Sequence, residues 1–211
     1  MQQFAAALPW LEPSEVGLAW LLFAVIFLTR RRQVRVIEQF RDRRAAIGLL
    51  LQVAGYGIVR WGLRTPGSGF LVGDATAGVV TAPLALVILA VSLLLAYAAV
   101  QTLGKQWSLA ARLVQGHDLI EAGPYALVRH PIYTSMFGML IGTAIAVSSW
   151  QALLIGGAVF LVGTAVRIRV EEQLLVAAFG DKYRSYAAVV PPFIPWIRLG
   201  RSGADAVGPR P

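Results

Sequence analysis

The stretch at residues 77–103, AGVVTAPLALVILAVSLLLAYAAVQTL, decides the fold class because it runs for 27 residues without a charged side chain. A helix that crosses the roughly 30 Å hydrocarbon core of a bilayer needs about 20 mostly apolar residues. This stretch therefore predicts a transmembrane helix. The whole chain agrees with that prediction: its 211 residues are 57% hydrophobic and 14% charged, with a mean hydropathy of +0.64, whereas soluble domains carry about 25% charged residues.

Four further apolar stretches predict helices of the same kind: 16–29, 45–63, 132–147 and 152–166. The last two come from one apolar run that is too long for a single crossing and is interrupted by the polar step Ser148-Ser149-Trp150-Gln151. We therefore expect a tight helical hairpin there. Gly138 and Gly142 are spaced as a small-xxx-small pair, which lets two helices approach closely. The predicted fold is an all-α, polytopic transmembrane helical bundle of about five spans.

Positive charge predicts how this bundle is oriented. The formal net charge is +8, and seven arginines lie in or at the end of the loop 30–44, directly after the first span. Cytoplasmic loops carry an excess of Lys and Arg, so this loop is expected inside and the N-terminus outside. Of the 19 cations, only Arg60 and Arg64 then fall on the outer side. We interpret the basic loop as an orientation signal that contacts anionic lipids, and we expect no nucleic-acid partner because Phe40 is its only aromatic residue.

The chain is expected to divide into three parts. Residues 1–103 hold three spans, residues 104–199 hold the hairpin and the polar segments, and the Gly/Pro-rich tail 200–211 is expected to be disordered. We expect no cleaved leader, because the first four residues lack the positive region of a secretory signal.

Polar chemistry is concentrated in two segments. GHDLIEAGPYALVRHPIY (116–133) holds both histidines, and RIRVEEQLLVAAFGDKYRSY (167–186) predicts a helix that continues the fifth span and stops at Phe179-Gly180. On that helix Arg167 and Glu171 are four residues apart and share a face, as do Arg169 and Glu172 at three residues apart. From the residues alone, surface salt bridges and a site for a cationic ligand explain the two glutamates equally well.

Several other kinds of site are not expected. Cysteine is absent, so there is no disulfide and no thiolate metal ligand. No close-spaced histidine motif indicates a metal site, and no GxSxG, P-loop or GxGxxG pattern is present.

The two polar segments, together with Pro192-Phe193-Ile194-Pro195, resemble the C-terminal catalytic region of the isoprenylcysteine carboxyl methyltransferase family. The wider group includes phospholipid N-methyltransferases and small-thiol methyltransferases. The resemblance covers about residues 104–197 and rests on RHP-x-Y, a glutamate pair some 40 residues on, and F-G-x-x-Y, in this order. It implies a cytoplasmic C-terminal region that binds S-adenosyl-L-methionine.

The resemblance also implies which residues form the site. The implied cofactor-binding residues are His117, Asp118, Leu119, Ile120, Tyr125, Arg129, His130, Pro131, Ile132, Tyr133, Glu171 and Glu172. Arg167 is implied at the substrate side, as the catalytic residue that orients the methyl acceptor. The expected partners are membrane lipids and a lipophilic or lipidated substrate with an isoprenylcysteine-like carboxylate.

Alternatives remain open for the acceptor and for the class of protein. Phospholipid amines and small thiols are alternative acceptors, and a non-catalytic membrane scaffold or transporter is the alternative of another class. Because arginine greatly outnumbers lysine and Ala, Gly and Val are abundant, we expect a bacterial inner-membrane protein with its site facing the cytoplasm.

Overall fold

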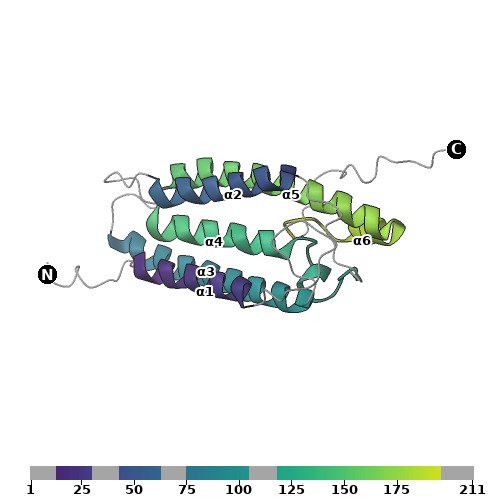
Figure 1. Ribbon diagram of the computed structural model, residues 1–211. Coiled ribbons are helices and arrows are strands. Elements are labelled where there is room, and N and C mark those ends of the chain that lie inside the picture. Colours follow the sequence, from purple (N-terminus) through teal and green to yellow (C-terminus); the bar gives the residue numbers. More distant parts are fainter. Residues whose placement is uncertain (1–12, 30–42, 63–74, 105–117, 196–211) are drawn as a thin grey trace.

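The computed structural model is all-α and describes residues 13–29, 43–62, 75–104 and 118–195. Its helices are α1 (Pro13–Leu28), α2 (Arg43–Trp61), α3 (Ala75–Leu103), α4 (Pro131–Val147), α5 (Trp150–Phe179) and α6 (Asp181–Val189), with a short 3-10 turn, η2 (Gly123–Ala126). Figure 1 shows α1 to α5 side by side along one axis, with α6 at one end of the bundle. Most of the predicted arginine-rich loop and the predicted disordered tail lie outside the described residues.

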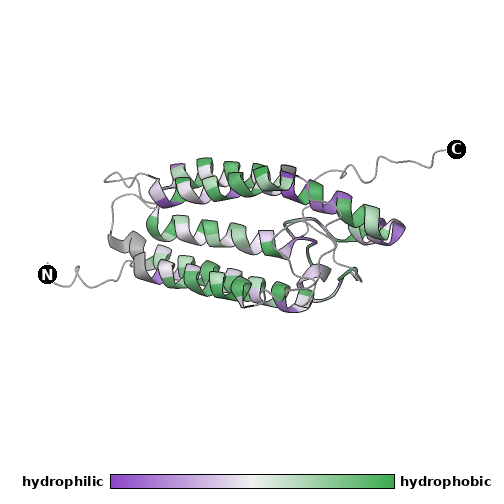
Figure 2. Ribbon diagram, in the orientation of Figure 1, coloured by the Kyte–Doolittle hydropathy of each residue, from purple (hydrophilic) through white to green (hydrophobic). Residues whose placement is uncertain are grey.

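Four of the five apolar stretches correspond to α1–α4 within a few residues, and the fifth, 152–166, forms the first part of α5. By length and composition, two helices of the described part are suited to cross a membrane, over Val80–Leu103 and Trp150–Phe179, and two shorter helices are also apolar, over Glu15–Leu28 and Pro131–Val147. The structure thus supports two candidate spans, and the count of five stays a prediction. Figure 2 shows hydrophobic colouring along most of the bundle and hydrophilic colouring toward the end that carries α6.

The predicted hairpin between α4 and α5 is confirmed. Ser148 closes α4, and Ser149 caps α5 by accepting a hydrogen bond from the backbone N–H of Ala152 at 3.2 Å. Such a cap satisfies one of the N–H groups that have no partner within the helix. The continuation of α5 is confirmed as well, since this helix ends at Phe179, followed by Gly180 with a φ of 54°.

Glycines bring α2 and α5 into close antiparallel contact. A Cβ atom on Gly55 would lie 2.6 Å from the carbonyl oxygen of Gly156, and one on Gly48 would lie 2.8 Å from the carbonyl oxygen of Gly163. The two glycines on α2 are seven residues apart, and so are the two glycines on α5; seven residues correspond to about two helical turns. The two backbones therefore meet directly along one face, with no room for a side chain between them.

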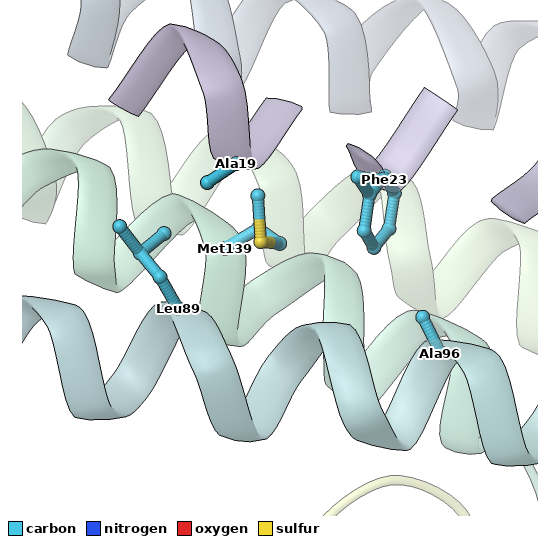
Figure 3. Packing of buried hydrophobic residues seen from close by; sticks show 5 residues of the cluster. All are labelled: Ala19, Phe23, Leu89, Ala96 and Met139. Atoms are coloured by element: carbon cyan, nitrogen blue, oxygen red, sulfur yellow. The ribbon is translucent and has the colours of Figure 1, made fainter. Parts of the chain in front are cut away.

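A second packing unit joins α1, α3 and α4. Its buried core contains Ala19, Phe23, Leu89, Ala96 and Met139, which Figure 3 shows between these three helices. The close approach predicted from Gly138 and Gly142 is confirmed and is made to α3: a Cβ atom on Gly142 would lie 2.8 Å from the Leu89 side chain, and one on Gly138 would collide with Ser92.

Hydrogen bonds between side chains and neighbouring helices tie the elements together. The Tyr56 hydroxyl of α2 donates to the carbonyl of Met136 in α4 at 2.6 Å. The Trp20 indole of α1 donates to the Thr143 hydroxyl of α4 at 3.0 Å. Such bonds fix helices relative to one another in an interior where an unpaired polar group is costly.

Candidate functional site

An irregular backbone precedes α4, and its glycine and proline residues explain why. Gly123 opens η2 with a φ of 58°, a left-handed conformation that favours glycine. His130 precedes a proline and has a φ of −124°, since the α conformation is disfavoured before proline. Pro131 begins α4, where its missing N–H is not needed. The loop of residues 118–130 is therefore non-helical on both sides of η2.

A C-terminal strap, residues 190–193, pairs with this loop. The backbone N–H of Arg129 donates to the carbonyl of Pro191 at 2.9 Å, and that of His130 donates to the carbonyl of Pro192 at 3.0 Å. Because proline has no N–H, the loop supplies the donors of both bonds. The strap thereby fixes the backbone of the Arg-His-Pro motif.

Side-chain hydrogen bonds also connect α6 and Phe193, the last residue of the strap, to the elements around this loop. The Tyr186 hydroxyl donates to the carbonyl of Tyr125 in η2 at 2.6 Å. The Thr134 hydroxyl of α4 donates to the carbonyl of Phe193 at 2.5 Å. The end of the chain's described part thus contacts both η2 and the first turn of α4.

Six side chains from the loop, α4 and α5 meet in an ionic cluster: Arg129, His130, Tyr133, Arg167, Glu171 and Glu172. All of them are buried except Glu171, which is partly exposed. Buried charges are strongly destabilising unless they are paired and hydrogen-bonded. The two arginines and two glutamates of the cluster balance each other.

Arg129 is held by α5 on one side and by α6 and the strap on the other. Its Nε and Nη2 atoms donate to Oε1 of Glu172, at 2.9 and 2.5 Å. Its Nη1 atom donates to the carbonyls of Ala187 and Val190, at 2.8 and 2.6 Å. A guanidinium has five N–H donors, so four of them are used within the protein.

His130 lies between the two glutamates. Its Nδ1 atom is 3.5 Å from Oε2 of Glu171, and its Nε2 atom is 3.4 Å from Oε1 of Glu172. Burial opposes a charge on the ring, but the hydrogen bonds and negative charges of both glutamates outweigh it and raise the pKa of His130 above its usual value. The imidazole is therefore held in a site that favours its protonated form.

Glu171 is the exposed member of the pair, with 24% of its side chain accessible compared with 6% for Glu172. It accepts a hydrogen bond from the Tyr133 hydroxyl and lies 3.6 Å from Nη2 of Arg167. Arg167 also donates from Nε to the Tyr133 hydroxyl at 2.7 Å and lies over the Tyr133 ring, 5.3 Å from its centroid. Arg167, Tyr133 and Glu171 thus form one connected unit.

The structure brings together seven of the residues that the sequence singled out. Tyr125 joins the six members of the cluster: burial raises the pKa of its hydroxyl and the charge of Glu171 raises it further, so it stays protonated at neutral pH. Pro131 and Ile132 begin α4 beside them. Asp118 is exposed, Leu119 and Ile120 are partly buried in the loop, and His117 lies outside the described residues.

Of the two salt bridges that helical spacing allowed, the one between Arg169 and Glu172 does not form. Arg169 is exposed on α5, whereas Glu172 is buried and bonded to Arg129 from the loop. Helical spacing places two residues on one face, but it does not say which charge a different segment presents to them. The other, between Arg167 and Glu171, is present, with Nη2 of Arg167 3.6 Å from Oε1 of Glu171.

Two tyrosines of α6 join the site although they were not predicted from the sequence as site residues; Tyr183 had appeared only as the end of the F-G-x-x-Y motif. Tyr183 and Tyr186 are both buried, and burial raises the pKa of each hydroxyl. The negative charge of Glu172 raises the pKa of Tyr183 as well. Their spacing of three residues, which puts both on one helical face, is the signal that would have found them.

No metal centre is visible in the described ranges: no group of three or more His, Cys, Asp or Glu side chains there is arranged to hold an ion. The chemistry of the site is that of paired carboxylates, guanidinium groups and phenols.

Fold and site together define an all-α protein with helices of membrane-spanning length and a buried ionic cluster at one end of the bundle. Residues 83–177 match the model of the isoprenylcysteine carboxyl methyltransferase family. Through this region the chain is similar to that family.

Similar proteins carry two kinds of name. The chain is 36% identical over 88 residues to "Protein-S-isoprenylcysteine O-methyltransferase" of Schizosaccharomyces pombe, which covers 42% of this chain and 37% of the relative. It is 31% identical over 104 residues to "Nickel-cobalt-cadmium resistance protein NccN" of Alcaligenes xylosoxydans xylosoxydans, covering 48% and 47%, and 29% identical over 103 residues to "Cobalt-zinc-cadmium resistance protein CzcN" of Cupriavidus metallidurans, covering 47% and 46%. The chain thus spans less than half the length of each of these relatives.

Proposed function

We propose that this chain is an integral membrane methyltransferase that uses S-adenosyl-L-methionine and acts on a lipophilic acceptor. The observation that carries the proposal is Glu171, a partly exposed carboxylate at the edge of a cluster whose other members are buried. A carboxylate in this setting is a strong acceptor for a cationic ligand group, and the similarity to the family indicates which ligand this is.

The residues present fit the cofactor, which carries an ammonium, a carboxylate and a sulfonium. In this proposal Glu171 accepts hydrogen bonds from the ammonium. The irregular backbone of residues 118–120 receives the carboxylate, and His130, whose two ring nitrogens face the glutamates, holds Glu171 in place. Tyr125 and Tyr133 offer aromatic rings to the adenine or the sulfonium.

When bound, the cofactor supplies a methyl group on a positively charged sulfur. The protein's part is to align the acceptor with that group and to keep water away. Arg167 suits an anionic acceptor, because its guanidinium is already oriented by the Tyr133 hydroxyl and by the carbonyl of Ala45, 3.4 Å from Nη1. An acceptor that arrives as a carboxylate or thiolate needs no general base for the transfer.

The proposed acceptor is an isoprenylcysteine-like carboxylate reached from the bilayer, with the site on the cytoplasmic face of a bacterial inner membrane. Phospholipid amines and small thiols stay as alternative acceptors. A screen with isotopically labelled methyl donor against lipid extracts and prenylcysteine analogues, read by mass spectrometry, distinguishes among them.

Equilibrium binding of S-adenosyl-L-methionine to the purified protein tests the proposal. We expect saturable binding by the wild type and an affinity about 10- to 100-fold lower in Glu171→Gln, since a hydrogen bond to a charged group contributes about 1.5–3 kcal/mol. Glu15→Gln makes the same change at an exposed position in the first turn of α1 and serves as the control. Absence of binding at millimolar cofactor, or equal affinity of wild type and Glu171→Gln, would refute the proposal.

The alternative of a non-catalytic scaffold or transporter gains support from the two relatives named for metal resistance. It makes a different prediction for the same variant: Glu171→Gln would then change the stability of the protein and leave every ligand measurement unaffected.

A further inference from the structure

The two adjacent glutamates of the ionic cluster have different partners, and the difference assigns a role to Arg129. We infer that Arg129 is a positioning residue, which locks Glu172 to α6 and the strap and thereby places His130 and Glu171, without contacting the cofactor itself. The part of this inference that concerns the cofactor rests on the proposed function; the part that concerns the lock does not.

The donors of Arg129 are committed within the protein. Two of them bind one oxygen of Glu172 and two bind the carbonyls of Ala187 and Val190. Recognition of a ligand carboxylate by arginine typically uses two parallel N–H donors, and Arg129 has only one left. Its guanidinium is also buried, with 5% of the side chain exposed.

The carbonyls that Arg129 binds are those that α6 cannot satisfy itself. The last four carbonyls of a helix have no intrahelical partner; Ala187 lies in the last turn of α6, and Val190 is the C-cap residue directly after it, where the strap begins. A positive side chain at that end is doubly favourable, because it donates hydrogen bonds and faces the negative end of the helix dipole. Arg129 therefore caps α6 from outside the helix.

This cap connects to the ligand-facing residues through the backbone and through Glu172. The N–H groups of Arg129 and His130 donate to the strap directly after α6. Glu172, held by Arg129, lies 3.4 Å from Nε2 of His130, while the opposite ring nitrogen faces Glu171. Loss of the Arg129 lock would release the strap and the position of the imidazole together.

The test compares Arg129→Lys with the wild type. Lysine keeps the charge but is a single point donor, so it cannot bind Glu172 and both carbonyls. Arg184→Lys is the matched control, because Arg184 lies on α6, is 41% exposed in its side chain and pairs only with Asp181 among the ion pairs of the described region. Three quantities are measured in detergent micelles: hydrogen exchange of the Arg129 and His130 amides, the pKa of His130 by NMR, and the affinity for S-adenosyl-L-methionine. The chain has two histidines, so His117→Gln assigns the signals.

We expect Arg129→Lys to speed exchange of both amides by about tenfold or more, to lower the pKa of His130 toward its usual value and to weaken cofactor binding, with Arg184→Lys unchanged in all three. Should Arg129→Lys fail to fold, Glu172→Gln takes its place: it keeps the cap on α6, and it is expected to lower the pKa of His130 and to weaken cofactor binding less than Glu171→Gln does.

Two results would overturn the inference. One is wild-type exchange and wild-type His130 pKa in Arg129→Lys. The other is weaker cofactor binding in that variant with both of these quantities unchanged, which would make Arg129 a direct ligand. If the wild type itself binds no cofactor, the proposed function fails, and the exchange and histidine measurements still decide whether Arg129 is the lock.

Discussion

Replacement of Gly55 by alanine tests how the α2–α5 pair is held. The new Cβ atom would lie 2.6 Å from the carbonyl oxygen of Gly156 and 2.9 Å from Cβ of Phe160, where ordinary contacts begin at 3.4 Å. Because the nearest atom belongs to a backbone, the two helices must move apart. Overpacking of this kind costs about 1–3 kcal/mol, and alanine regains about 0.5–1 kcal/mol over glycine inside a helix. The expected net loss is about 0–2.5 kcal/mol, which is about 1–3 kcal/mol relative to a Gly→Ala change that meets no backbone.

Gly57→Ala is the control, because it makes the same change two residues away on the same helix. A Cβ atom at Gly57 would meet only the Trp61 ring, at 3.7 Å. The only expected effect is therefore the higher helix propensity of alanine, so the free energy of unfolding stays the same or rises by up to about 1 kcal/mol. The free energy of unfolding is measured by denaturant titration in micelles, followed by far-UV circular dichroism. Equal stability of Gly55→Ala and Gly57→Ala would refute the direct backbone contact.

Three further predictions concern the site. The pKa of His130 is raised in the folded state, so its contribution to stability is fully present below about pH 6.5 and is lost as pH rises through the raised pKa; unfolding free energies measured from pH 6 to 9 should show this loss, and His130→Gln should abolish it. Tyr186→Phe removes the hydrogen bond to the Tyr125 carbonyl and should lower the unfolding free energy by about 0.5–1.5 kcal/mol in the same assay. Gly48→Ala places a Cβ atom 2.6 Å from Cγ of Arg167; it should lower both stability and methyl transfer, whereas a purely structural effect would lower stability alone.

The helices were predictable because each is encoded locally. An uninterrupted apolar run such as 77–103 indicates a helix without reference to any other segment, and α3 spans it. The break between α4 and α5 was equally local, since Ser149 is a capping residue type at the midpoint of a run too long for one helix. Hydropathy does not decide how many helices cross a membrane, because short apolar helices such as α4 also suit a protein interior.

The pairing of helices and charges was not predictable in the same way. Gly48 and Gly163 are 115 residues apart in sequence, and neither carries a sign of its partner. Arg129 and Glu172 are 43 residues apart and meet because the α4–α5 hairpin brings the start of α4 beside the end of α5. Helical spacing favoured Arg169 as the partner of Glu172 on local grounds, and a tertiary contact prevailed. The motif that resembles the family predicted which residues gather, and the structure adds how they are connected.

The matched family region and the ionic cluster do not have the same limits. Residues 83–177 include Arg129, His130 and both glutamates, but the region ends before α6. The carbonyls of Ala187 and Val190, which accept two of the hydrogen bonds of Arg129, follow it. Without them a buried guanidinium would keep two donors unsatisfied, at about 1–3 kcal/mol each. The stability of the buried motif therefore depends on the segment that follows the matched region. A change at the end of α6 acts on the site as directly as a change within the motif.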